Sequence, residues 1–204
     1  MPNTQVIRFA LAISAATIIS ASAYAQAGDP AAAKIDAFDA ALIKTLQAGK
    51  AAGVEGRAKV IGPAVEQAFD LPLMTRVAVG PTWTKIAPED QEALQKAYAR
   101  FAIANYAKNF SDYSGQKLEL DGPVVDRAPD KIVKTKLTGG GANVSLSYRM
   151  RMDGGSWKVV DVFYNSSISQ LATQRSDFAS TLSSGGAKAL VAKLQAQTDK
   201  LLKS

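Results

Sequence analysis

The first half of the chain carries hydrophobic residues at the three- and four-residue spacing of amphipathic helices. Ile35, Phe38, Leu42 and Leu46 recur at this spacing directly after Asp29-Pro30, where an acidic N-cap precedes a proline in the first turn. The same reasoning, with glycine and proline as breaks, predicts helices over residues 30–49, 54–61, 64–69, 71–79 and 87–110.

The helix predicted over residues 87–110 is hydrophobic over a wide arc. Leu94, Tyr98, Phe101, Tyr106 and Phe110 do not fall on one narrow stripe. A helix with such an arc is normally buried on two sides. We therefore expect other elements to pack against it from both sides.

After Ser111 the hydrophobic period changes from helical to two, which is typical of strands. Strands are predicted over residues 116–121, 123–127, 131–138, 142–152 and 157–164. In the fourth strand, apolar side chains alternate with serine and arginine. In the last strand both faces are apolar, so we expect both to be covered, with Val160, Val162 and Tyr164 on the inner face.

Two more helices, over residues 167–182 and 186–202, close the chain. Helices, then an antiparallel meander, then helices indicate an α+β fold with helices packed on a curved sheet. We find no internal repeat and no low-complexity linker, so residues 26–204 are predicted to form a single domain.

Residues 1–25 are typical of a secretory signal peptide. Arg8 is followed by an apolar stretch, and Ala23-Tyr24-Ala25 is a small-residue cleavage pattern. The apolar stretch is short for a membrane span, and no later segment reaches about 18 apolar residues. We expect cleavage after Ala25 and export to the periplasm.

The composition excludes much of catalytic chemistry. Among 204 residues there is no His and no Cys. The chain therefore lacks an imidazole base, a thiol nucleophile, a disulfide and a zinc thiolate site. Net charge is +6, and removal of Arg8 with the leader leaves 23 basic against 18 acidic residues. We predict no cofactor, no metal and no enzymatic activity.

Basic residues gather on two predicted strands. Lys134 and Lys136 share one strand face, and Arg149 and Arg151 share another. No nucleic-acid-binding motif accompanies them, so nucleic acid is not an expected partner. A solvated outer sheet face explains these residues, and the alternative is a docking surface for an acidic partner or anionic headgroups.

Asp161 lies in an otherwise apolar strand, where an unpaired charge would be costly. It could serve as a base with a perturbed pKa, near Tyr164. A structural role is favoured, because no second catalytic group is evident and Arg175 is available downstream as a partner. We predict a buried Asp161–Arg175 pair.

The chain contains more apolar surface than a plain sheet-and-helix sandwich requires. The excess is explained either by a thick core or by a cavity between sheet and helices, and the pattern leaves both readings open.

A set of residues in a fixed order resembles the toluene-tolerance/MlaC family over residues 30–200. The set comprises Phe69-Asp70, Gly80 with Trp83, Tyr106, Tyr113-Ser114-Gly115-Gln116, Trp157-Lys158-Val159-Val160-Asp161-Val162, Arg175 with Phe178, and Gly186 with Leu190. The resemblance implies an NTF2-like or cystatin-like sheet wrapped by helices, with an apolar cavity between them. It also implies a monomeric periplasmic lipid carrier between an inner-membrane ABC-type complex and an outer-membrane lipoprotein complex.

One string departs from the phospholipid carriers of that family. Gln174-Arg175-Ser176-Asp177-Phe178 looks more like the hopanoid-associated branch, HpnM. The resemblance therefore leaves two ligand classes open, a diacyl phospholipid and a hopanoid.

The inward strand faces and the wide helix supply the residues expected to line the lipid pocket. They are Phe69, Leu73, Val77, Phe101, Tyr106, Leu146, Tyr148, Met150, Val160, Val162 and Tyr164. Two other functions stay open at this point: an NTF2-like enzyme of the isomerase type that uses Asp161, and an envelope adaptor that binds no ligand.

Overall fold

The computed structural model describes residues 28–165 and 167–204, so the predicted signal peptide lies outside the described residues. The α-helices are α2 (Pro30–Ala48), α3 (Gly53–Ala68), α4 (Leu71–Val79), α5 (Pro88–Asn109) and α6 (Gln170–Leu202). Short 3-10 helices, η1 (Lys50–Ala52) and η2 (Gly80–Lys85), follow α2 and α4.

The strands of the described part of the chain pair antiparallel in one sheet. They are β1 (Lys117–Leu120), β2 (Val125–Arg127), β3 (Asp130–Gly139), β4 (Ala142–Asp153), β5 (Ser156–Tyr164) and β6 (Ile168–Ser169). Their order is β1-β3-β4-β5-β6, and β2 also pairs with β3. The fold is α+β with a curved antiparallel sheet and helices, as the sequence predicts.

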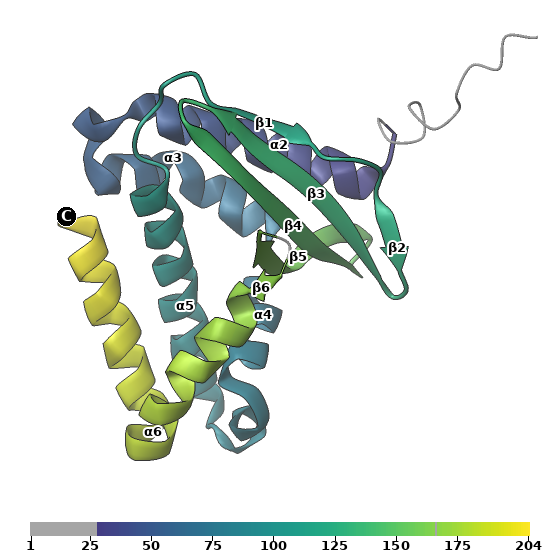
Figure 1. The fold of residues 1–204 in the computed structure, drawn as a ribbon. Coiled ribbons are helices and arrows are strands. Elements are labelled where there is room, and N and C mark those ends of the chain that lie inside the picture. The colour runs from purple at the N-terminus through teal and green to yellow at the C-terminus, as the bar shows by residue number, and fades with distance from the viewer. Residues whose placement is uncertain (1–27, 166) are drawn as a thin grey trace, which may run out of the picture.

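The helices gather on one side of the sheet and beyond its β5 end (Figure 1). Helix α2 crosses the sheet, α5 descends from it, and the two arms of α6 form a V whose second arm runs beside α5. Helix α5 contacts α3, α4 and α6, which explains the wide apolar arc of its sequence.

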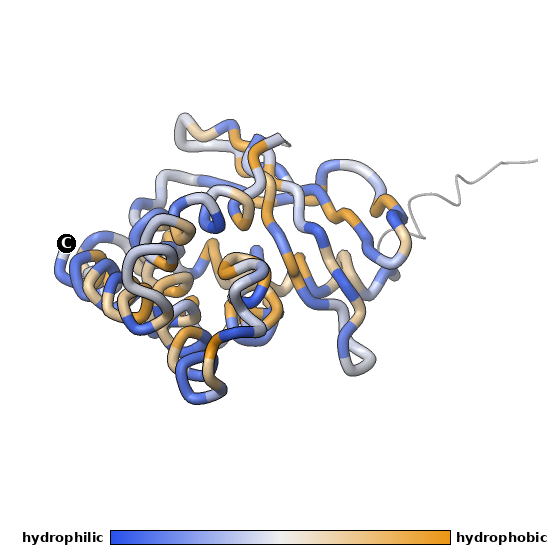
Figure 2. The backbone as a smooth tube through the Cα atoms, turned by 90° about the horizontal axis from the view of Figure 1, so that it is seen from below, coloured by the Kyte–Doolittle hydropathy of each residue, from blue (hydrophilic) through white to orange (hydrophobic). Residues whose placement is uncertain are grey.

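The core lies between α2 and the inner face of the sheet. Phe38 is 1% exposed and meets the ring of Tyr148 edge-on, with 6.1 Å between the ring centroids. Hydrophobic and hydrophilic residues alternate along the strands (Figure 2). The buried hydrophobic ones, among them Val133, Tyr148 and Met150, belong to the same core as Phe38 of α2.

The break predicted at Gly62-Pro63 is wrong, because α3 continues through Pro63. Proline removes one intrahelical hydrogen bond, to the carbonyl of Lys59. Pro63 and Lys59 are both exposed, so water can bind that carbonyl. Ile61 and Val65, each 0% exposed, keep the helix packed on both sides of the proline.

The two helices predicted at the C-terminus are the two arms of α6. Gly186 separates them with a non-helical backbone, φ 66° and ψ −162°. Positive φ is the region that glycine adopts most readily, so the angle between the arms is fixed by this residue.

A β-bulge changes the facing of β5. Arg149 pairs with Asp161 and Met150 pairs with Val159, so Val160 is an extra residue that has no paired residue on β4. The bulge places Val159 and Val162 on the inner face with Met150 and Tyr148. The single inner face predicted for Val160, Val162 and Tyr164 is therefore interrupted at Val160.

Candidate functional site

Two adjoining cavities lie between the inner face of the sheet, α5 and the first arm of α6. Their volumes are about 420 and 440 Å³, within the usual range of small-molecule sites. They share five wall residues: Asn105, Tyr106, Asn109, Val162 and Gln170.

The first, which we name the apolar cavity, reaches under the strands toward α2. Hydrophobic side chains from α2, the C-terminal end of α5 and three strands form most of its wall, and Ser111, Asp112 and Gln116 complete it. Besides the shared residues, the hydrophobic members are Leu46, Phe110, Leu137, Val144, Leu146 and Tyr164.

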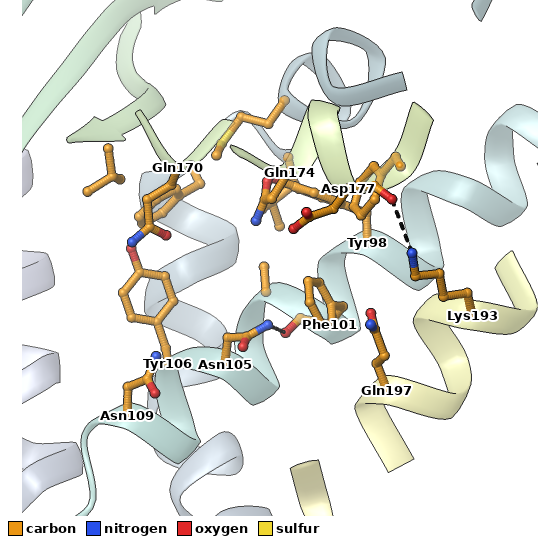
Figure 3. Close-up of a pocket in the computed structure, with 16 residues that line it drawn as sticks. Tyr98, Phe101, Asn105, Tyr106, Asn109, Gln170, Gln174, Asp177, Lys193 and Gln197 are labelled. Atoms are coloured by element: carbon orange, nitrogen blue, oxygen red, sulfur yellow. Dashed lines mark hydrogen bonds between the residues drawn. The ribbon is translucent and has the colours of Figure 1, made fainter. Parts of the chain in front are cut away.

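The second, which we name the amide cavity, lies between α5 and the two arms of α6 (Figure 3). Its apolar wall comes mainly from the α3–α4 junction, α4 and α5, and its polar wall comes mainly from α5 and α6. Besides the shared residues, its lining comprises Phe69, Leu71, Met74, Tyr98, Phe101, Ala102, Gln174, Asp177, Phe178, Lys193 and Gln197.

Tyrosines in and beside these cavities stay neutral. Burial raises the pKa of Tyr98 and of Tyr106 well above the ordinary phenol value. The hydroxyl of Tyr98 donates a 2.6 Å hydrogen bond to Oε1 of Gln174, which joins α5 to α6 across the amide cavity.

Six residues predicted to line a lipid pocket lie around these two cavities. Phe69 and Phe101 line the amide cavity, Leu146 and Tyr164 line the apolar cavity, and Tyr106 and Val162 line both. They come from the α3–α4 junction, α5, β4 and β5, so residues far apart in the sequence meet at one place.

Three other predicted residues lie elsewhere. Leu73, Val77 and Val160 line a smaller hollow of about 270 Å³ on the outer side of β5, together with arginines. Helix α4 turns Leu71 and Met74 inward, which leaves Leu73 and Val77 on its other face. We name this smaller site the outer hollow.

Tyr148 and Met150, also predicted to line the pocket, are instead core residues. Both are 0% exposed and neither lines the apolar or the amide cavity. Helix α2 covers their part of the sheet, so the space beside them is filled by side chains such as Phe38.

Asp161 has partners other than the predicted Arg175. Its Oδ2 accepts a 2.6 Å hydrogen bond from the hydroxyl of Ser169. Its Oδ1 accepts from the backbone N–H of Val162 at 2.8 Å and of Leu171 at 3.2 Å. Among the described residues, no ion pair within 4.0 Å joins Asp161 to Arg175, which is exposed on α6.

The arginines predicted on the outer sheet face are bound to a buried carboxylate. Arg149 and Arg151 donate to Asp130 through Nε at 2.5 and 2.6 Å, and Asp130 is 4% exposed. Although burial alone would raise it, the hydrogen bonds from the two arginines hold the pKa of Asp130 below its usual value. Much of this positive charge is therefore neutralised within the fold.

Sequence reasoning missed the polar lining of the amide cavity. Asn105 and Asn109 are four residues apart on α5, and Gln170 and Gln174 are four apart on α6. This spacing puts each pair on one helix face, and it was readable beside the hydrophobic pattern. The pairs were overlooked because the hydrophobic residues of α5 dominate its pattern and because asparagine and glutamine carry no charge.

Two features are absent from the described residues. Among residues 28–165 and 167–204, no group of three or more acidic side chains could share a metal ion. Within the same residues, no helix combines the length and apolarity needed to cross a bilayer.

The chain matches one family model and shares its fold with solved structures. The model of the family described as MlaC protein matches residues 36–196. A phospholipid-binding protein from Ralstonia solanacearum, solved in complex with a phospholipid, has the same fold, with a TM-score of 0.73, 22% identity, and coverage of 85% of this chain and 99% of that chain. No curated protein matches the chain.

Proposed function

Because the chain belongs to the MlaC family, we propose that it is a non-enzymatic lipid carrier. In this proposal the apolar cavity holds hydrocarbon and the adjoining amide cavity faces the polar end of the lipid. The carrier would bind one lipid at a time and release it unchanged.

The observation that carries this proposal is the apolar cavity itself. It has a volume of about 420 Å³, and Leu46, Leu137, Val144 and Leu146 supply hydrocarbon surface on its wall. Hiding a 16-carbon chain from water is worth about 13 kcal/mol, at about 0.8 kcal/mol per methylene. A lipid can therefore cross an aqueous space only inside a comparably apolar enclosure.

The likeness to the Ralstonia protein supports the same function. That protein was solved with a phospholipid bound, and it shares this fold over 85% of the present chain. We infer that the space between sheet and helices serves lipid binding here as well. Both a diacyl phospholipid and a hopanoid are candidates, and the string at residues 174–178 favours the hopanoid-associated HpnM branch.

We place the carrier in the periplasm, as a monomer exported by a signal peptide over residues 1–25. The family assignment suggests that it collects lipid from one membrane complex and delivers it to another. The proposed partners are an inner-membrane ABC-type complex and an outer-membrane lipoprotein complex.

The isomerase alternative receives no support from the geometry of Asp161. Its carboxylate accepts three hydrogen bonds, and it lines the outer hollow rather than either large cavity. A general base must reach the proton that it removes, and a substrate in the large cavities would lie across β5 from this group.

The decisive experiment is the purification of residues 26–204 from the periplasm of a lipid-rich host. Native mass spectrometry should find a protein–lipid complex, and solvent extraction should release and identify the lipid. A folded protein that carries no lipid, and takes none up from vesicles containing phospholipid or hopanoid, contradicts the proposal.

A further inference from the structure

The amide cavity has an unusual polar wall. Five carboxamide side chains line it: Asn105 and Asn109 from α5, and Gln170, Gln174 and Gln197 from α6. In Figure 3 these side chains surround an open space, and Gln170 and Tyr106 point toward one another. The wall adjoins the apolar cavity, so a lipid in that cavity would reach it with one end.

Two of the carboxamides offer opposite hydrogen-bonding groups. Nδ2 of Asn105 donates to the carbonyl of Phe101 at 2.9 Å, which leaves its Oδ1 able to accept. Oε1 of Gln174 accepts from the hydroxyl of Tyr98 at 2.6 Å, which leaves its amide N–H groups able to donate. The cavity therefore presents a fixed acceptor and a fixed donor.

The charges of the cavity do not suit an anion. Its single cation among the described lining residues, Lys193, donates at 3.1 Å to the carbonyl of Asp177 and at 3.1 Å to the hydroxyl of Thr181. The carboxylate of Asp177 lines the same space. Arg149 and Arg151 line the outer hollow instead, where Asp130 holds their guanidinium groups.

We propose that the amide cavity binds an uncharged, hydroxyl-bearing polar group of the lipid and discriminates against a phosphate. This inference rests on the proposed carrier function. A hydroxyl both donates and accepts, so it can pair with Asn105 and Gln174 at once. A phosphate dianion only accepts, and in this cavity it would face the oxygen of Asn105 and the carboxylate of Asp177 without a guanidinium partner.

The test uses two lipids that differ only by phosphate. Monooleoylglycerol and oleoyl lysophosphatidic acid have the same acyl chain and the same glycerol. Lipid-free protein is incubated with an equimolar mixture, and native mass spectrometry measures the ratio of the two complexes. We expect roughly a tenfold preference for monooleoylglycerol, the effect of one or two hydrogen bonds in a partly closed site.

Variants of the cavity wall show whether the preference comes from this site or from the different solubilities of the two lipids. Asn105→Leu and Gln197→Leu remove polar lining and should lower the preference several-fold. Gln195→Leu is the matched control, because Gln195 lies on the same arm of α6 but lines a different hollow. Asp177→Asn removes the negative charge and should raise binding of the phosphate-bearing lipid specifically.

The outcomes are distinguishable. Equal binding of both lipids, or a preference for lysophosphatidic acid, overturns the inference but leaves the carrier function intact. The inference is also overturned if Asn105→Leu and Gln197→Leu keep the same preference for monooleoylglycerol as Gln195→Leu. Failure to bind either lipid, or any phospholipid or hopanoid, contradicts the carrier function itself.

Discussion

The hydroxyl of Ser169 donates a 2.6 Å hydrogen bond to Oδ2 of Asp161, and this contact fixes the start of α6 to the middle of β5. The same hydroxyl accepts from the N–H of Ala172 at 2.9 Å, so Ser169 is both the N-cap of α6 and the link to the strand. Oδ1 of Asp161 accepts from Leu171 in the first turn. A buried carboxylate at a helix N-terminus is stabilised by these donors and by the helix dipole.

Asp161→Asn is therefore expected to loosen α6. The amide that replaces Oδ2 cannot accept from Ser169, and the favourable charge at the helix N-terminus is lost. We expect the free energy of unfolding to fall by roughly 1–3 kcal/mol. Hydrogen exchange of the backbone amides in the first turns of α6 should accelerate, which mass spectrometry can measure.

Asp177→Asn provides the control for this prediction. Asp177 lies on the same arm of α6 and is exposed, so its replacement should leave both the unfolding curve and the exchange rates nearly unchanged. Equal behaviour of the two variants would show that Asp161 does not anchor the helix.

A second prediction concerns Asp39, a buried carboxyl group of α2. It is 4% exposed, the hydroxyl of Tyr148 lies 3.5 Å from its Oδ1, and its Oδ2 has no hydrogen-bond partner among the described residues. Burial, with a smaller effect of Asp36, raises the pKa of Asp39 to about 7. In the unfolded chain the pKa of an aspartate is about 3.9.

The sign of the pH effect follows from this difference. Between about pH 4 and 7 the folded protein keeps a proton on Asp39 that the unfolded chain has lost, so this group stabilises the fold less as the pH rises through that window. The amide in Asp39→Asn does not titrate, so the variant does not lose stability in this way as the pH rises. Relative to wild type, we expect the variant to gain on the order of 1–3 kcal/mol of stability between pH 5 and pH 8.

Urea unfolding of wild type and Asp39→Asn at several pH values checks this prediction. At pH 5 the folded states of both proteins are neutral at this position, and the carboxyl and the amide are nearly isosteric, so the difference in stability should be smaller at pH 5 than at pH 8, which serves as the internal control. A difference between the two proteins that is the same at pH 5 and pH 8 would contradict a raised pKa for Asp39.

Local signals made most of the helices predictable. Asp29 accepts from the N–H of Ala31 at 2.8 Å and Asp70 accepts from the N–H of Leu73 at 2.9 Å, so both act as N-caps at the positions that the sequence indicates. Caps depend on residues a few positions apart, which a sequence displays directly. The helix break at Pro63 was mispredicted because distant packing, which a sequence does not display, decides whether a helix survives a proline.

The walls of the site were only partly predictable for the same reason. The inner face of β5 depends on the bulge opposite Arg149 and Met150, a property of strand pairing rather than of β5 alone. Which face of α4 points inward depends on the elements that pack against it. The sequence of α4 alone therefore does not show that Leu71 and Met74, rather than Leu73 and Val77, line the cavity. Leu146 was predictable because apolar and polar residues alternate along β4, and Phe101 and Tyr106 were predictable because a helix with a wide apolar arc is covered on more than one side.

The angle between the arms of α6 yields a third prediction. Gly186 has φ 66°, and a Cβ atom there would meet nothing within 4 Å, so any cost of substitution is conformational. Gly186→Ala should lower the free energy of unfolding by roughly 1 kcal/mol. Ser184→Ala, at an exposed helical position nearby, is the control and should be nearly neutral. Thermal unfolding of both variants measures the difference, and an unaffected Gly186→Ala would indicate that the arms readily straighten.

The last prediction tests whether the apolar cavity holds the lipid. Leu146 is half-buried on β4 and its side chain lines that cavity, so Leu146→Trp should fill part of the volume of about 420 Å³. Steric exclusion should lower the lipid bound per purified protein by several-fold, measured by native mass spectrometry or by extraction.

Met152→Trp is the matched control for Leu146→Trp. Met152 lies on the same strand but is 48% exposed and outside the cavity, so a tryptophan there should leave the lipid content unchanged. Near-ultraviolet circular dichroism establishes that both variants are folded, because the cavity argument applies only to folded protein. If folded Leu146→Trp carries as much lipid as Met152→Trp, the hydrocarbon chain lies elsewhere, and the space under β3, β4 and β5 is not the binding site.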